Sequence, residues 1–213
     1  MSDENKQILT AEQIEAAGLP DWRPMLQALH ARFRTGNFAT GLRMANLIGE
    51  AAEEANHHPD LDLQYPRLDV RLFSHDVFGV TQRDIALARR ISEAAAEVGA
   101  TADPSGVSAM ELALDTPDHK RIKPFWMAVL GYRDNPEADD EVRGDDAGMP
   151  TLWFQASGSE EPRQRFHIDI RVPKELQRQR IEAAVAAGGQ VVDEASTFTV
   201  LADADGNKVC ICI

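Results

Sequence analysis

The sequence predicts an α+β protein of two domains, and three observations carry this prediction. In residues 1–99, amphipathic helical segments alternate with segments whose side chains switch between apolar and polar. Residues 107–213 repeat an order of strand, helix and strands. Between them, residues 99–106 are small and turn-forming, which is typical of a linker. We therefore expect a first domain at 1–99 and a second at 107–213.

The first domain opens with a helix and a strand. Thr10 and Gln13 stand at the spacing of a capping box, in which two side chains satisfy free backbone N–H groups, and Gly18 ends this helix. Residues 22–34 alternate between apolar and polar side chains, so we expect a half-buried strand paired with a short strand near Trp22. The apolar side of this strand is expected to be Leu29, Ala31 and Phe33.

A second helix is expected over residues 38–55, with Asn37 as its cap. Apolar residues recur in it at steps of three and four, which predicts one buried stripe. Pro59 disfavours continuation of the helix past His58. The expected stripe is Phe38, Leu42, Ala45, Ile48, Ala52 and Ala55.

Two further strands and a third helix complete this domain. Residues 61–65 and 68–72 alternate, and a capping pattern from Thr81 to Asp84 begins a helix that ends at Gly99. These elements predict an antiparallel four-stranded sheet with helices on one face, since that arrangement buries every apolar face. The expected buried residues are Leu61, Leu63, Tyr65, Leu68, Val70 and Leu72 in the strands and Ile85, Ala88, Ile91, Ala95 and Val98 in the helix.

The second domain is expected to contain paired β-α-β-β-β modules, because the same order of elements occurs twice. The acidic segment 135–150, rich in Gly and Pro, is expected to be a loop or partly disordered. The first module has strands at 110–115 and 151–155 and a helix at 118–130; the second has a strand at 165–172, a helix at 175–187 and strands at 198–201 and 208–213.

Composition and charge exclude several classes of partner. The net charge of −13 repels phosphate backbones and anionic lipids, which argues against nucleic acid and membrane surfaces. Cys210 and Cys212 stand two apart in an expected strand and cannot easily bridge, so a reducing compartment fits. The polar N-terminus lacks the order of a signal peptide, and no apolar run reaches the ~18–20 residues of a membrane span. We expect a soluble, cytoplasmic protein.

Three of the six histidines lie close together in the sequence at the ends of expected elements. His57 and His58 end a helix, where free carbonyls and the helix dipole favour a protonated imidazole, and His75 follows a strand. Removing water across a C–O bond needs one group to protonate the departing hydroxyl and another to take a proton from the neighbouring atom. Imidazoles do either near neutral pH, and adjacent imidazoles titrate apart. The pattern favours a histidine-based dehydratase.

Two other interpretations of these histidines stay open. A histidine at a helix end is often a cap or a solvated residue. Three imidazoles also suggest a metal site, although adjacent histidines rarely point at one ion and no glutamate follows them at helical spacing.

Several segments of the first domain share their residues and spacing with a known family. They are Leu9-Thr10, Leu19-Pro-Asp-Trp22, Glu53-Glu-Ala-Asn-His57-His58-Pro59, Tyr65, Val70-Arg-Leu-Phe-Ser-His75 and Gly79-Val-Thr81-Gln-Arg-Asp84. Over residues 8–99 the chain resembles the pterin-4a-carbinolamine dehydratase (4a-hydroxytetrahydrobiopterin dehydratase) family, whose fold is the α+β arrangement expected above.

The resemblance implies a pterin site with two walls, one formed by Asn56, His57 and His58, the other by Phe73, Ser74, His75 and Asp76. The three histidines would act as general acid and base in the loss of the 4a-hydroxyl. The product would be a quinonoid dihydropterin, as needed to recycle a tetrahydrobiopterin-type cofactor, and no metal or organic cofactor would take part.

The resemblance also bears on supporting residues and partners. Glu53 would orient His57 or remain solvated, and Asp84 would be a helix cap first and a site residue second. Leu61 stands where the family often has an aromatic residue, so we expect a weaker stacking surface for the pterin. Family members self-associate, which implies a dimer or tetramer. One member doubles as a transcription-factor partner, so a pterin-binding regulatory protein without turnover is an alternative function.

Residues 107–213 resemble the glyoxalase/bleomycin-resistance (vicinal oxygen chelate) superfamily. The matching segments are Leu112-Ala-Leu-Asp-Thr-Pro-Asp118, Phe125-Trp126, Leu130-Gly131-Tyr132, Arg165-Phe-His167-Ile-Asp169-Ile and Leu201-Ala-Asp-Ala-Asp205-Gly-Asn207.

Metal-dependent members of that superfamily hold a divalent ion at four strand positions, which are Glu111, Gln155, His167 and Cys210 here. This set is unusual for a hard metal, so we favour a cavity that is empty or takes an organic ligand. A metal-dependent lyase, isomerase or dioxygenase centred on this domain is a further alternative. The aromatic residues Trp126, Trp153 and Phe154 are expected in the core rather than around a ligand.

Overall fold

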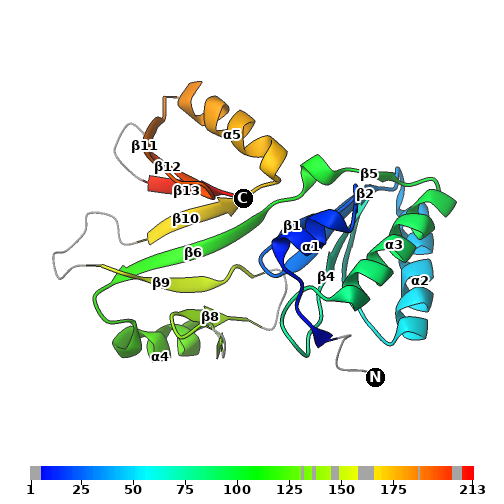
Figure 1. The fold of residues 1–213 in the computed structure, drawn as a ribbon, viewed down its shortest axis with the longest axis horizontal. Coiled ribbons are helices and arrows are strands. Elements are labelled where there is room, and N and C mark those ends of the chain that lie inside the picture. The colour runs from blue at the N-terminus through cyan, green and yellow to red at the C-terminus, as the bar shows by residue number, and fades with distance from the viewer. Residues whose placement is uncertain are drawn as a thin grey trace. The chain divides into compact units, whose positions relative to one another are not determined.

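The computed structural model describes residues 6–130, 132–135, 138–144, 149–157, 166–186, 188–202 and 208–213 (Figure 1). The chain divides into two compact units, Met1–Val107 and Ser108–Ile213. Each unit has its own sheet and its own helices, which confirms the α+β class. Among the described helices, none combines the length and apolar character needed to cross a membrane.

The sheet of the first unit is antiparallel and has the strand order β1-β2-β4-β3. The predicted four-stranded sheet is therefore confirmed, and a short fifth strand pairs with β2 at one end. The strands are β1 (Arg23–Met25), β2 (Ala28–Arg34), β3 (Asp60–Gln64), β4 (Arg67–Leu72) and β5 (Thr101–Ala102).

Three helices contribute to the core on one face of this sheet: α1 (Ala11–Ala16), α2 (Phe38–Ala55) and α3 (Gln82–Glu97). The alternation in β2 and β4 directs their apolar residues toward α2 and α3, which lie side by side in Figure 1. The opposite face is charged, and Arg32 makes a two-pronged ion pair there with Asp69. The core includes Leu29, Ala31, Phe33, Met44, Ile48, Leu68, Val70, Leu72, Ile85, Ala88 and Ile91.

The buried stripe of α2 differs from the prediction. Phe38 and Leu42 are 51% and 49% exposed, while Gly41 and Met44 are buried. The first half of the helix is thus rotated relative to the expected stripe. Gly41 explains the rotation, because a Cβ atom there would lie 2.6 Å from the side chain of Leu63 on β3. The absence of a side chain at Gly41 lets α2 lie close to β3 at this point.

Strand β3 is also less buried than predicted. Leu63 is half-buried, but Leu61 and Tyr65 are exposed. The reason is position: β3 lies at the edge of the sheet and pairs with β4 alone. An alternating pattern identifies a strand face, yet it cannot tell a central strand from an edge strand.

The segment expected to be a linker belongs to the first sheet. Thr101–Ala102 pairs with β2, and a short 3-10 helix follows at Pro104–Gly106. The Asp103 carboxylate accepts two hydrogen bonds from Arg34, at 2.9 and 2.7 Å. The small residues of this segment therefore serve as a sheet edge rather than as a free connection.

The second unit has an eight-stranded sheet in the order β11-β12-β13-β10-β6-β9-β8-β7. Two modules of the predicted β-α-β-β-β order meet where β6 and β10 pair antiparallel. The first contains β6 (Ala109–Thr116), α4 (His119–Leu130), β7 (Arg133–Asp134), β8 (Glu141–Arg143) and β9 (Leu152–Ala156); the second contains β10 (Phe166–Arg171), α5 (Lys174–Ala186), β11 (Gln190–Glu194), β12 (Phe198–Ala202) and β13 (Lys208–Cys212).

The acidic segment 135–150 is not only a loop. Glu141–Arg143 forms β8, and its central Val142 is fully buried in the core with Leu152 and Phe154. The prediction missed this strand because three residues are too few to show an alternating pattern. Residues 136–137 and 145–148 of this segment lie outside the described residues, as do Gly131, Arg165, Ala187 and 203–207 of the segments discussed above.

Candidate functional site

His57 is buried because of how α2 ends. Asn56 adopts a left-handed conformation (φ 46°, ψ 46°) as the C-cap, and the backbone N–H of His57 donates to the carbonyl of Ala52. This reversal turns the imidazole toward α3. There its Nε2 lies 2.7 Å from Oδ1 of Asp84, and both side chains are almost completely shielded from solvent.

Asp84 joins three segments of the first unit through one buried carboxylate. Its Oδ1 faces His57, while its Oδ2 accepts from the backbone N–H of Thr81 at 2.7 Å and from the hydroxyl of Ser74 at 2.7 Å. The Thr81 hydroxyl lies 3.0 Å from the same oxygen. Burial raises the pKa of Asp84, but hydrogen bonds from His57, Ser74 and Thr81 outweigh it and leave the pKa below its ordinary value. The carboxylate is therefore ionised at neutral pH.

The Asp84 contact fixes the tautomer of His57. A carboxylate accepts hydrogen bonds, so Nε2 of His57 must carry the hydrogen that points at Asp84. In the neutral ring the lone pair then lies on Nδ1. A buried carboxylate that orients an imidazole in this way is a recurrent device in acid–base catalysis.

His58 is in a different setting from its neighbour. Its Nε2 lies 3.2 Å from Oε1 of Glu53, and both side chains are largely exposed. Of the two expected roles for Glu53, the structure fits the solvated one: its side chain is largely exposed and contacts His58, while His57 is held by Asp84. The helical spacing of Glu53 and His57 was misleading, because the left-handed residue at Asn56 turns His57 away from the helix face.

His75 is exposed on a tight turn that follows β4. The backbone N–H of Ser74 donates to the carbonyl of Gly79 at 2.9 Å, which closes the turn at its base. The ring of Phe73 lies 4.1 Å from that of His75, centroid to centroid, and the guanidinium of Arg71 lies 4.5 Å from the Phe73 ring. The imidazole is therefore supported on one side by a ring that is itself covered by a cation.

Asp76, on the same turn, makes ion pairs rather than standing free. Its carboxylate lies 2.6 Å from Arg83 and 3.2 Å from Lys6. These hydrogen bonds, that of Arg83 above all, lower the pKa of Asp76 to about 2. The side chain is therefore a fixed negative charge beside His75 at any pH near neutrality.

A hollow of about 280 Å³ lies beside His57, between the end of α2 and the start of α3. Its lining includes the imidazole together with two arginines, and both arginines have carboxylate partners elsewhere. The lining residues are Ala55, His57, Gln82, Arg83, Ala86, Leu87 and Arg90.

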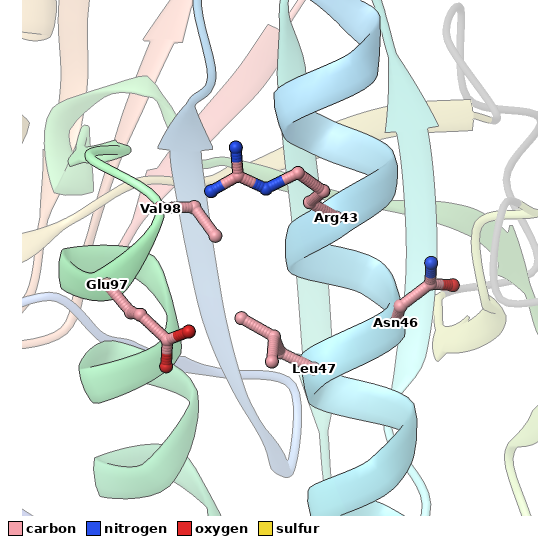
Figure 2. Close-up of a pocket in the computed structure, with 5 residues that line it drawn as sticks. All are labelled: Arg43, Asn46, Leu47, Glu97 and Val98. Carbon is pink, nitrogen blue, oxygen red and sulfur yellow. The ribbon is translucent and has the colours of Figure 1, made fainter.

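A second hollow lies between the same helices but carries none of the predicted site residues. Its volume is about 210 Å³, and it is lined by Arg43, Asn46, Leu47, Glu97 and Val98. Figure 2 shows Arg43 and Leu47 pointing toward α3 and Asn46 pointing away. Without a titratable group near neutral pH, this hollow offers no acid–base chemistry, and the candidate site remains at His57.

The sequence reasoning missed the partner of His57. Asp84 was expected first as a cap, and it does complete a capping box with Thr81, but the same carboxylate also holds His57. No spacing rule could have revealed this pair, because 27 residues separate its members. His30 stands apart on β2, where burial and then Arg71 lower its pKa to about 4, so it is neutral at pH 7.

In the second unit, strand pairing places a row of polar side chains on the sheet face opposite the helices. Gln155 and Asp115 are paired across β9 and β6, and Asp169 is paired with both Glu111 and Cys210. The Nε2 atom of His167 lies 2.5 Å from Gln155 and 3.9 Å from Asp115. Of the four expected metal ligands, Glu111 accepts a hydrogen bond from Arg171 at 2.8 Å.

The aromatic residues of this unit divide between the two faces. Phe154 is buried in the core and Trp126 packs against that core, as predicted. Trp153 lies on the polar face instead, where its indole N–H donates to Asp169 and its ring lies 5.5 Å from that of His167. The expectation that Trp153 lies in the core was wrong, because its indole N–H donates to the buried carboxylate of Asp169 on the polar face.

The polar face fits a divalent ion poorly. His167, Asp169 and Cys210 each offer a donor atom, and these atoms lie within 4.8 Å of one another. However, both ring nitrogens of His167 already face acceptor oxygens, at 3.2 Å from Asp169 and 2.5 Å from Gln155. Burial and then Asp169 raise the pKa of the Cys210 thiol to about 12, so this thiol is protonated at neutral pH.

Comparison with known proteins distinguishes the two units. Residues 7–94 match the family model of pterin 4 alpha carbinolamine dehydratase, and residues 111–212 match that of a glyoxalase-like domain. A protein of Thermomicrobium roseum named "Putative pterin-4-alpha-carbinolamine dehydratase" is 40% identical over 77 residues, which are 36% of this chain and 83% of the relative.

Solved structures give matches to both units as well. A transcriptional coactivator/pterin dehydratase from Brucella melitensis is 30% identical, with a TM-score of 0.41, covering 42% of this chain and 99% of that one. A glyoxalase/bleomycin resistance protein/dioxygenase superfamily member from Vibrio splendidus is 16% identical, with a TM-score of 0.35, covering 50% of this chain and 98% of that one.

Proposed function

The chain belongs to the pterin 4 alpha carbinolamine dehydratase family, and from this membership we propose that its first unit removes water from a 4a-hydroxytetrahydropterin. The product is a quinonoid dihydropterin, and the reaction serves to recycle a tetrahydrobiopterin-type cofactor. The C4a–O bond breaks as the hydroxyl is protonated and leaves as water. A proton is lost from the neighbouring ring nitrogen, so the reaction is balanced without an oxidant or reductant.

The observation that carries this proposal is the buried carboxylate of Asp84. It holds His57 through one oxygen and, through the other, Ser74, the residue that precedes His75. Two histidine segments that are distant in sequence are thus fixed to one anchor. Acid–base catalysis uses imidazoles whose orientation is fixed by a buried carboxylate.

The proposed roles follow from exposure. His58 and His75 are accessible to a bound pterin, so they are the groups that donate and accept protons. His57 is held in one tautomer by Asp84 and contributes an oriented ring to the wall that Asn56 and His58 share. We propose that Phe73 and Asp76 line the opposite wall with His75.

The test is turnover by the purified full chain. We expect dehydration of 4a-hydroxytetrahydropterin to be faster than the spontaneous reaction in the same buffer, because positioned acids and bases accelerate proton transfer by about 10²–10⁴-fold. Treatment with EDTA should leave the rate unchanged, since the proposed proton transfers use side chains only. A wild-type rate equal to the spontaneous one would refute the proposal. Pterin binding without turnover would instead support a regulatory pterin-binding protein.

For the second unit, we propose that the polar face around His167 takes a small organic ligand rather than a resident metal. The support is that both ring nitrogens of His167 already face acceptor oxygens of neighbouring side chains. A titration with Co²⁺ at pH 7 checks this. We expect no thiolate-to-cobalt absorption band.

The contrary result has a defined signature in the same titration. A one-to-one absorption band that disappears in Cys210→Ser would identify a metal site on the polar face. The matched control is Cys212→Ser, which removes the neighbouring thiol on the same strand. Because the chain has two cysteines, a thiolate band that survives in each single variant and disappears in the double variant would mean that either thiol binds the ion, and it would also overturn the organic-ligand proposal.

A further inference from the structure

Ser74 has an unusual position for a residue expected in the substrate wall. Its side chain is completely buried, and its hydroxyl donates to Oδ2 of Asp84 at 2.7 Å. The hydroxyl oxygen also lies 2.9 Å from that of Thr81. A hydroxyl with two partners in the protein interior has no freedom to contact a pterin.

The backbone of Ser74 holds the turn that presents His75. Its N–H donates to the carbonyl of Gly79, and its carbonyl accepts from the N–H of Val77 at 3.2 Å. His75 is the next residue and is exposed. The backbone of this turn therefore determines where the His75 imidazole lies. The buried hydroxyl of Ser74 links the turn to Asp84 by a hydrogen bond.

We infer that Ser74 is a positioning residue, which fixes His75 relative to His57 by tying the His75 turn to the carboxylate that holds His57. The expected changes in rate rest on the proposed dehydratase function. The expected change in the position of His75 does not. Removing the hydroxyl leaves the turn closed by backbone hydrogen bonds and tied to α3 through the Asp76–Arg83 ion pair, but breaks its link to Asp84. A displacement of about 1 Å in a catalytic group can cost about 10²-fold in rate.

Thr81 offers a matched control for Ser74. Its hydroxyl lies 3.0 Å from the same Asp84 oxygen, so Thr81→Ala also removes a hydroxyl near that oxygen. Thr81 stands at the start of α3, however, and not in the His75 turn. If only the number of hydrogen bonds to Asp84 matters, Ser74→Ala and Thr81→Ala have equal effects on kcat/KM.

The experiment compares the two substitutions in two backgrounds. In the otherwise wild-type chain we expect Ser74→Ala to lower kcat/KM by about 10–100-fold, mostly through kcat, and Thr81→Ala by less. In the His75→Ala background, Ser74→Ala should cost less than in the wild-type chain, because only its effect through Asp84 on His57 is left, whereas Thr81→Ala should cost the same in both backgrounds. An equal loss from Ser74→Ala in both backgrounds would overturn the inference.

A second measurement needs no turnover and separates this inference from the proposed function. The ring signals of the histidines are followed by NMR in the free protein, after assignment by single His→Gln variants. Ser74→Ala should shift or broaden the signals of both His57 and His75, while Thr81→Ala, which removes a hydroxyl that also contacts that of Ser74, should affect His57 more than His75. An unchanged His75 signal in Ser74→Ala would refute the positioning role even if the wild-type enzyme is active. Inactive wild-type protein with the expected shifts would refute only the dehydratase.

Discussion

Asp84→Asn should lower kcat/KM by about 10²-fold, the cost that misplacement of a group in the site can carry. The reason is geometric. Oδ2 of Asp84 faces the backbone N–H of Thr81 and two hydroxyls, so the amide oxygen of an asparagine must take that place. Its NH₂ group would then face Nε2 of His57, which would have to give up its hydrogen. The substitution thus reverses the tautomer of His57 while preserving the size of residue 84.

The pH dependence of stability gives an independent check on Asp84. Because its pKa is lower in the folded protein, its contribution to stability is present above the ordinary carboxyl pKa of about 4 and is lost as pH falls below that value. The difference in Tm between wild type and Asp84→Asn should therefore be larger at pH 7 than at pH 3.

The control for Asp84 is Asp62→Asn, which removes one carboxylate charge from exposed β3 in the same unit. It should change neither the rate nor the shape of the Tm curve, since exposed substitutions away from special features rarely matter. An Asp84→Asn enzyme with wild-type activity would show that the tautomer of His57 is irrelevant to the reaction.

The elements that the sequence predicts correctly are those set by local patterns. The alternation in β4 and the capping box at Thr81 and Asp84 each depend on neighbouring residues alone, and the structure confirms both. The errors arise where tertiary contacts decide. The rotation of α2 depends on the approach of Gly41 to Leu63, and the exposure of Tyr65 depends on β3 lying at an edge.

The candidate site shows the same division more sharply. The histidines could be selected from residue type and spacing, because their chemistry and their motif are visible in the sequence. The hydrogen bond between His57 and Asp84 could not, since it joins the end of one helix to the start of another. Glu53 illustrates the risk: its helical spacing left open a contact with His57, but the left-handed residue Asn56 turns that histidine away, and Glu53 lies beside His58.

The exposed histidines give the other large expected effect. His58→Ala and His75→Ala should each lower kcat/KM by about 10²–10⁴-fold, because each removes a group that moves a proton in the reaction. Neither should change the free energy of unfolding by more than about 0.5 kcal/mol, since both side chains are exposed and the contact of His58 with Glu53 lies on the surface. His119→Ala, which removes an imidazole beside Asp139 in the second unit, is the control.

The pH profiles of these two variants test the division of labour between them. If one imidazole is the acid and the other the base, wild-type kcat/KM follows a bell-shaped curve, and each substitution abolishes one limb of it. Loss of the same limb in both variants would mean that the two histidines act on one proton. Unchanged rates in both would remove the exposed histidines from the reaction, and His57 with its carboxylate would then have to act through Nδ1 alone.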